Sequence, residues 1–221
     1  AAQEQYIRQA TGALRESGEL DYREPFGRFT SVGPAVAGEM KAKAVQALLY
    51  SMVAIFFYIW LRFQFRAAFG AGACLALAHD VLFTIGAVAV ADGVFDLGIQ
   101  IDLPVVAALL TIVGYSLNDT IVVFDRIREN LGSGGASLRE VINLSVNQTL
   151  SRTLLTSVTT LLVVLALLIL GGQVIRGFAF SLLVGVLVGT YSSVFIASPT
   201  LVFLEGWARR RREAKAAAGN A

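Results

Sequence analysis

The chain has 221 residues, of which 56% are apolar and 15% are charged, and its mean hydropathy is +0.67. This composition excludes an ordinary soluble domain, since the apolar share of such domains is about 45–50%. The net charge of +2 does not indicate a nucleic-acid partner, because the basic residues are spread along the chain and not gathered on one face.

The first 38 residues are polar, with a short helix expected at Ala2–Ser17 and one strand at Arg28–Val32. They are too few to bury a core by themselves. We therefore expect residues 1–38 to be the C-terminal part of a larger external α+β domain. A start at Ala1 without Met favours a fragment or a processed product.

Residues 39–205 are expected to form a transmembrane domain. Its apolar stretches are about 20 residues long, which is enough for a helix to cross a hydrocarbon core about 30 Å thick. In chain order, the spans are predicted near residues 45–61, 67–91, 103–124, 153–170 and 178–204. The fold class is thus an all-α polytopic membrane protein with five transmembrane helices.

The charges between the spans predict the orientation. Basic residues follow the first, third and fifth spans: Arg62 and Arg66; Arg126, Arg128 and Arg139; Arg209, Arg210, Arg211, Arg212 and Lys215. By contrast, Asp92–Asp102 carries three aspartates and no Lys or Arg. The positive-inside rule then places the basic tail, residues 206–221, in the cytoplasm and the N-terminal segment outside.

A helix start is predicted between the third and fourth spans. Ser137 is the expected N-cap, and Glu140 stands at the capping-box position. The residues that follow predict an amphipathic, interfacial helix over Leu138–Ser145 that anchors the loop.

Asp119 is an acid within the third span, which is otherwise rich in Val, Ile, Leu, Ala and Thr. A carboxylate in hydrocarbon costs roughly 2.5–3.5 kcal/mol, so a proton, a partner or water must neutralise it. Arg152, at the start of the neighbouring span, is the predicted counter-charge, because both lie at a similar depth, about 10 Å from the cytoplasmic boundary for Asp119. Together they are the predicted proton-coupling pair.

Further polar side chains surround this predicted pair. Tyr115, Ser116 and Asn118 are close to Asp119 in sequence, and the face of Arg152 continues through Thr156, Thr159 and Thr160. A static salt bridge that locks two helices, or an Arg152 that reaches lipid phosphate, is the alternative to a functional site. The surplus of polar groups favours function, because a structural bridge does not need it.

Other polar and small residues lie within the spans. His79 and Asp80 suggest a proton relay, since imidazole titrates near neutrality, or alternatively a bond from Asp80 to a neighbouring helix. For Asp125, at the membrane edge, a helix-end salt-bridge network is expected. Four-residue spacing of small residues predicts close helix packing in the fifth span, at Gly177, Ser181, Gly185 and Gly189.

These residues resemble the SecF family, including the SecF half of fused SecDF proteins. The resemblance runs from about Ser31 to Leu204. It rests on Val32-Gly33-Pro34, His79-Asp80, GYSLNDTIVVFDRIREN (Gly114–Asn130), NQTLSRTLLTS (Asn147–Ser157) and Ile175–Ala179.

The resemblance implies a transporter fold of the resistance-nodulation-division type, with two pseudo-symmetric six-helix halves. Five helices of one half are present here. It also implies an auxiliary subunit of the Sec translocase that uses the proton-motive force to promote preprotein export across the bacterial inner membrane. The implied partners are SecD, SecYEG, YajC, YidC, unfolded preprotein and protons. The family's essential acid and arginine fall on Asp119 and Arg152.

Three other functions stay open at this point. One is a proton-driven exporter of small molecules or lipids from the same superfamily. Another is an intramembrane aspartyl protease that uses Asp80 and Asp119, although a Gly-x-Gly-Asp signature is absent. The third is a passive scaffold. We expect no enzymatic activity, no cofactor and no metal.

Overall fold

The computed structural model describes residues 34–64, 66–95, 98–99, 101–132 and 137–219. The helix expected at Ala2–Ser17 and the strand expected at Arg28–Val32 lie outside these residues. Met40–Ala221 form one compact unit, which contains the five predicted spans.

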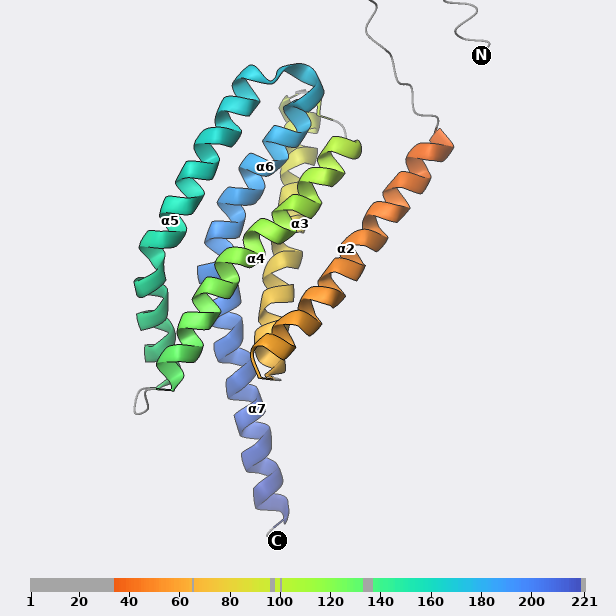
Figure 1. Cartoon of the computed structure of the whole chain (residues 1–221). Coiled ribbons are helices and arrows are strands. Elements are labelled where there is room, and N and C mark those ends of the chain that lie inside the picture. Colours follow the sequence, from red (N-terminus) through yellow and green to blue (C-terminus); the bar gives the residue numbers. More distant parts are fainter. Residues whose placement is uncertain (1–33, 65, 96–97, 100, 133–136, 220–221) are drawn as a thin grey trace, which may run out of the picture. The chain divides into compact units, whose positions relative to one another are not determined.

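The described residues fold into long helices (Figure 1). The helices are α2 (Pro34–Arg62), α3 (Ala67–Phe95), α4 (Leu103–Leu131), α5 (Leu138–Leu170), α6 (Gly172–Ser192) and α7 (Ser198–Gly219), and a π-helical turn at Ser193–Ala197 joins the last two. They contain five stretches long and apolar enough to cross a bilayer, the last of which runs through the π turn from Gly172 to Ala208. The prediction of five membrane-spanning helices is confirmed.

The fourth span differs from its predicted form. Ser137 Oγ accepts from the Glu140 N–H at 3.4 Å, and Glu140 Oε2 accepts from the Ser137 N–H at 2.8 Å, so the capping box is confirmed. A separate interfacial helix after it is wrong: α5 continues unbroken from Leu138 to Leu170. No Gly or Pro interrupts this segment, so nothing in the local sequence ends the helix.

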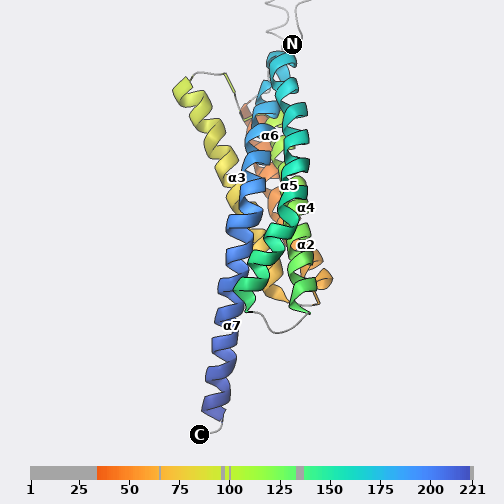
Figure 2. The ribbon, with the colours of Figure 1, turned by 90° about the vertical axis from the view of Figure 1, so that its left-hand side faces the viewer.

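Helix α6 is the centre of the packing, since it contacts α3, α4 and α5. In Figure 2, α6 runs between α3 and α5, and α7 continues from it beyond the ends of both. The approach to α4 is close: a Cβ added at Gly185 would lie 2.3 Å from Ile112 Cδ1, and one at Gly189 would lie 2.9 Å from Ser116 Cβ. Glycine at these two positions therefore sets the distance between α4 and α6.

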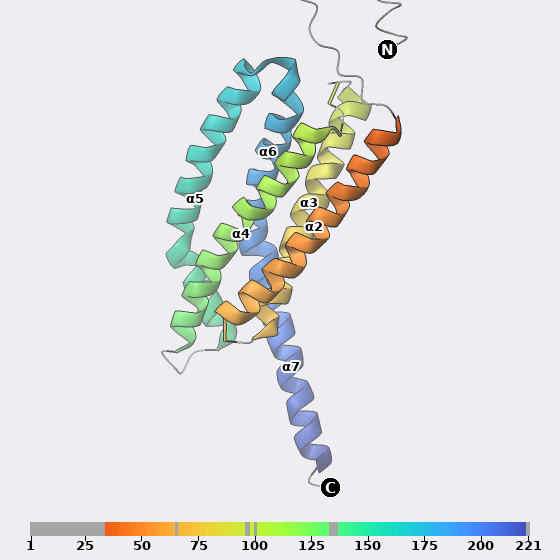
Figure 3. The ribbon, with the colours of Figure 1, turned by 45° about the vertical axis from the view of Figure 1, so that its right-hand side comes forward.

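Charged side chains gather where α2 and α4 end, and we call this the arginine-rich end. Arg62 Nη2 lies 3.0 Å from Asp125 Oδ2, which joins α2 to α4 and confirms the expected network at Asp125. Arg66 Nε lies 3.4 Å from Glu205 Oε1 on α7. Helix α7 extends beyond the other helices at this end (Figure 3).

Buried aromatic side chains pack against one another at the arginine-rich end. The rings of Phe63 and Phe69 stack with centroids 4.9 Å apart, and Phe124 meets Phe69 edge-on at 5.1 Å. These three side chains are at most 1% exposed. Helix α2 is anchored here, whereas nearer its start Tyr50 is 71% exposed.

The substitution Gly185→Ala tests the close contact between α4 and α6. We expect it to lower the free energy of unfolding by about 1–3 kcal/mol, because the new methyl group would lie within 2.9 Å of three carbon atoms of the Ile112 side chain. Gly114→Ala is the matched control, since its Cβ would meet nothing within 4 Å. The measurement is unfolding of the purified protein in detergent.

The double variant Gly185→Ala, Ile112→Ala should recover part of the lost stability, because it removes the overlapping side chain. Equal stability of Gly185→Ala and Gly114→Ala would contradict the close contact.

Candidate functional site

Asp119 lies on α4 and is only 3% exposed. The polar groups that act on its carboxyl are the Arg152 guanidinium and the Asn118 and Ser157 side chains. Its Oδ2 atom is buried and has no hydrogen-bond partner. A buried acceptor without a partner is costly for an ionised carboxylate, and this cost favours taking up a proton or a water molecule at Asp119.

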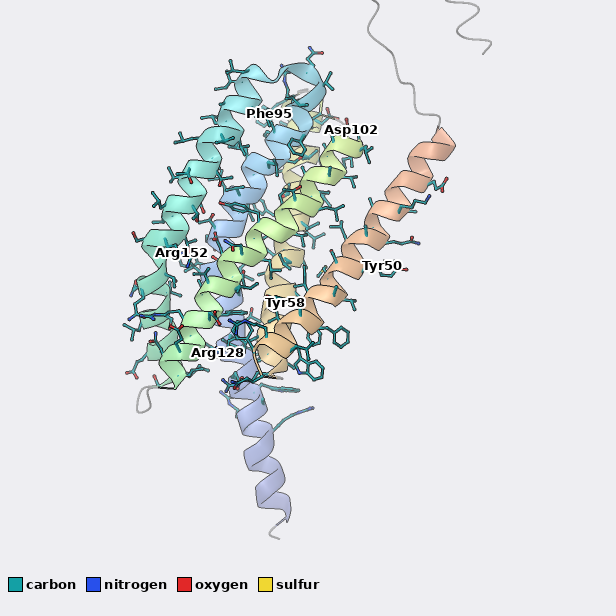
Figure 4. The ribbon with its side chains drawn as sticks, viewed as in Figure 1. Tyr50, Tyr58, Phe95, Asp102, Arg128 and Arg152 are labelled. Carbon is teal, nitrogen blue, oxygen red and sulfur yellow. The ribbon has the colours of Figure 1, made fainter. Side chains whose placement is uncertain are left out.

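Arg152 lies on α5 and is exposed. Figure 4 places it farther from the arginine-rich end than Arg128. Its side chain lines a groove of about 440 Å³ together with Asp125, Gln148 and other residues of α4 and α5. Arg152 acts on Asp119 through its charge, but none of the ion pairs among the described residues joins the two. Direct pairing of the two groups stays a prediction.

Hydroxyl groups of α5 and α6 lie beside Asp119. Ser157 Oγ and Thr190 Oγ1 are 2.6 Å apart and share a hydrogen bond that joins α5 to α6. One turn earlier, Thr153 Oγ1 is buried without a hydrogen-bond partner. Asp119 therefore shares a polar buried region with the Ser157 hydroxyl, and two buried oxygens of α4 and α5, Asp119 Oδ2 and Thr153 Oγ1, have no hydrogen-bond partner.

Thr153 and Ser157 are not among the predicted site residues, because the prediction followed the Thr156 face of α5. A signal for them exists in the sequence. Hydroxyl residues recur at four-residue spacing along one buried face of α5: Ser145, Thr149, Thr153 and Ser157. Such a stripe in an apolar helix marks the face that meets other helices.

The predicted threonine stripe is exposed and is bonded mainly within its own helix. Thr156 Oγ1 donates to the carbonyls of Arg152 at 3.1 Å and Thr153 at 2.9 Å. Tyr115 Oη of α4 donates to Thr160 Oγ1 at 3.2 Å. These hydroxyls can still accept a further hydrogen bond.

Asp80 forms a second polar centre, which is fully buried. Its Oδ2 accepts hydrogen bonds from Ser116 Oγ of α4 and, at 2.8 Å, from Ser192 Oγ of α6. His79 Nδ1 lies 3.1 Å from Oδ1. One carboxyl therefore joins α3, α4 and α6, just before the π turn that follows Ser192.

The two polar centres meet on α4, where Ser116 precedes Asp119 by three residues. No described hydrogen bond connects Asp80 to Asp119. The contacts of Asp80 are those of a residue that bonds neighbouring helices, and a relay through the half-exposed His79 stays a prediction. The described residues contain no cluster of acids, His and Cys that suits a metal ion.

Comparisons with known proteins place this geometry in a family. The family described as "Protein export membrane protein SecD/SecF, C-terminal" matches residues 15–207. A protein translocase subunit SecF from Desulfurispirillum indicum is 53% identical over 196 residues, which cover 86% of this chain and 60% of the relative. One from Rhodothermus marinus is 51% identical over 182 residues, 82% of this chain and 58% of the relative. The chain thus spans little more than half the length of these relatives.

Solved structures of SecDF are also similar to this chain. The crystal structure of SecDF from Thermus thermophilus, titled a translocon-associated membrane protein, has a TM-score of 0.68 and 47% identity over 79% of this chain and 23% of that one. SecDF in its super-membrane-facing form has a TM-score of 0.66 and 44% identity, covering 85% of this chain and 24% of that one. From the family match, the identities and the five spans, we conclude that this multi-pass membrane protein belongs to the SecD/SecF family of protein-export membrane proteins.

Proposed function

We propose that this chain is the membrane part of an auxiliary subunit of the Sec protein translocase, which uses the proton gradient to promote export of unfolded preproteins. The observation that carries the proposal is Asp119. In a family named for protein export, it is a buried acid at membrane depth with one carboxyl oxygen unpaired. Such a residue marks proton pathways in membrane proteins.

The coupling step is an exchange between two arrangements of Asp119 and Arg152. Ionised Asp119 attracts the guanidinium, and protonation removes that attraction and releases Arg152 toward the groove at the arginine-rich end. The released arrangement would leave Asp119 Oδ2 buried without a partner and would place Arg152 along the groove. Both features are present in this structure. Movement of α5 relative to α4 would then open the site to one side of the membrane at a time.

The free energy of proton movement limits the size of the conformational change that it can drive. One charge that crosses the full membrane potential gains about 2.3 kcal/mol per 100 mV. One or two protons can therefore bias a domain movement, but they cannot drive a large unfolding event.

The proposed setting is the bacterial inner membrane, with the arginine-rich end in the cytoplasm and the N-terminal segment outside. The arginines near the ends of α2 and α4 support this orientation. The proposed partners are SecD, fused or separate, and the SecYEG translocon, with YajC and YidC as further candidates. The subunit's role is non-catalytic. A small-molecule exporter is not favoured, because the relatives are named as translocase subunits.

Arg152→Gln in the full-length subunit tests the proposal. We expect the gradient-dependent part of preprotein export into membrane vesicles to fall at least about tenfold. Without the positive charge of Arg152, ionised and protonated Asp119 no longer differ in their attraction to α5. Arg152→Lys should retain part of the activity, since it keeps the charge but not the guanidinium geometry.

Arg126→Gln is the matched control, because Arg126 lines the same groove but interacts with Gln148 and Glu129 instead. Export that is reduced equally in Arg152→Gln and Arg126→Gln would show that groove charge in general matters, and it would contradict a specific role for Arg152.

A further inference from the structure

A second hollow in the protein lies between the start of α5 and the α6–α7 segment, apart from the Asp119 site. Its volume is about 670 Å³. The residues that define its character are Arg139, Asn143, Val194, Phe203, Trp207 and Arg210. One end is thus basic and polar, and the rest of the wall is apolar.

The two arginines of this hollow have no acidic partner among the residues that the structure describes. No ion pair or hydrogen bond of the described residues involves the side chain of Arg139 or Arg210. Glu205 lines an adjoining hollow together with Arg139, but it is already paired with Arg66 at 3.4 Å. The basic end of the hollow therefore carries positive charge that no ion pair of the described residues neutralises.

The basic end lies at the level where a bilayer would end. The candidate span of α5 begins with the helix at Leu138, beside Arg139, and the last candidate span ends at Ala208, beside Trp207. Trp is favoured at the membrane–water interface. The indole of Trp207 is also covered by the Arg211 guanidinium, 4.0 Å from its ring centroid.

The apolar wall continues from this level into the span. Phe203 is 72% exposed and Phe195 62% exposed, although both belong to a segment that crosses the membrane. The π turn at Ser193–Ala197 contributes Val194 and Phe195 to this wall. It ends two residues before Pro199, which has no N–H for a regular helical bond.

We propose that this hollow binds one anionic phospholipid, whose phosphate group lies between Arg139 and Arg210 and whose acyl chain lies along Phe203 and Phe195. Basic pockets between transmembrane helices at the cytoplasmic surface suit anionic headgroups. The unpaired arginines select for negative charge, Asn143 offers an amide donor to headgroup oxygens, and the exposed phenylalanines suit a hydrocarbon chain. A zwitterionic lipid has the same acyl chains but supplies no net charge to the arginines.

Native mass spectrometry of the intact membrane complex that contains this chain tests the proposal, with phosphatidylglycerol and phosphatidylcholine as the probes. We expect phosphatidylglycerol to bind with higher affinity, and Arg139→Gln, Arg210→Gln to lower that affinity roughly 30-fold, since each basic residue near a membrane surface contributes roughly fivefold. Affinity for phosphatidylcholine should stay unchanged.

The matched control is Arg128→Gln, Arg176→Gln. It removes the same number of charges from positions that do not line the hollow or cover its wall. Arg139→Lys, Arg210→Lys keeps the charge and should keep most of the affinity, which separates lipid binding from a folding defect. An equal loss in both Gln pairs, or no loss in either, would overturn the proposal.

A photo-crosslinking residue at Phe203 tests the occupant directly in the same complex. Crosslinks to phospholipid support the proposal, and crosslinks to another protein subunit in place of lipid would overturn it. Neither outcome depends on the role of Asp119, so the proton-coupling proposal stands or falls separately.

Discussion

Replacing Asp119 by Asn is expected to abolish the gradient-dependent part of preprotein export while the subunit still folds and assembles. Asn has the shape of Asp but cannot take up or release a proton. The Asp119 side chain is only 3% exposed and one of its oxygens has no partner. Burying an uncharged amide there therefore costs less free energy than burying a carboxylate. Export into inverted membrane vesicles, with and without a proton gradient, measures the effect.

The matched control is Asp125→Asn, on the same helix at the arginine-rich end. Asp125 pairs with Arg62 at a partly exposed position, so its loss should cost less than about 1 kcal/mol of stability and leave the coupling intact. Normal gradient-dependent export by Asp119→Asn would show that the coupling residue lies elsewhere.

The second large effect is expected at Asp80. Asp80→Leu should lower the free energy of unfolding by about 2–4 kcal/mol, because it removes the bonds from Ser116 and Ser192 and leaves the buried Ser116 hydroxyl without a partner. Asp80→Asn should fold and export almost normally. Its amide oxygen can accept from both serines, and its NH₂ group can donate to His79.

This pair of substitutions separates the two roles considered for Asp80. A helix-bonding residue tolerates Asn and not Leu, whereas a proton relay tolerates neither. Loss of gradient-dependent export in Asp80→Asn, with normal stability in detergent, would make Asp80 part of the proton path and contradict the helix-bonding role.

Much of the architecture was predictable, because its physical causes are local. Five spans follow from the length of the apolar stretches, and the capping box at Ser137 follows from two residues three positions apart. The acid in the third span was recognisable from sequence alone, because the free-energy cost of a charge in hydrocarbon is large whatever residues surround it.

The environment of Asp119 was only partly predictable. Rise per residue fixes how deep Asp119 and Arg152 lie, but rotation about the helix axis decides what each side chain faces, and packing sets that rotation. The hydroxyls of Thr153 and Ser157 lie on the buried face of α5, whereas the predicted stripe of Thr156, Thr159 and Thr160 does not. Likewise, the partner of Asp80 on α6 is 112 residues away in sequence, and no local pattern reveals it.

Helix α4 connects these features. Ser116 receives the close approach of Gly189 and donates to Asp80, and Asp119 follows one turn later. The α3–α4–α6 contact is thus held by a buried carboxyl and by glycine, while the α4–α5 contact next to it contains an acid with one unpaired carboxyl oxygen.

Infrared difference spectroscopy of the reconstituted complex, recorded as the pH is changed, tests the central claim most directly. The account predicts a carboxylic-acid signal that appears and disappears with pH, is absent in Asp119→Asn, and persists in Asp80→Asn. A signal that persists in Asp119→Asn and is lost in Asp80→Asn would contradict it, because the proton would then reside on Asp80.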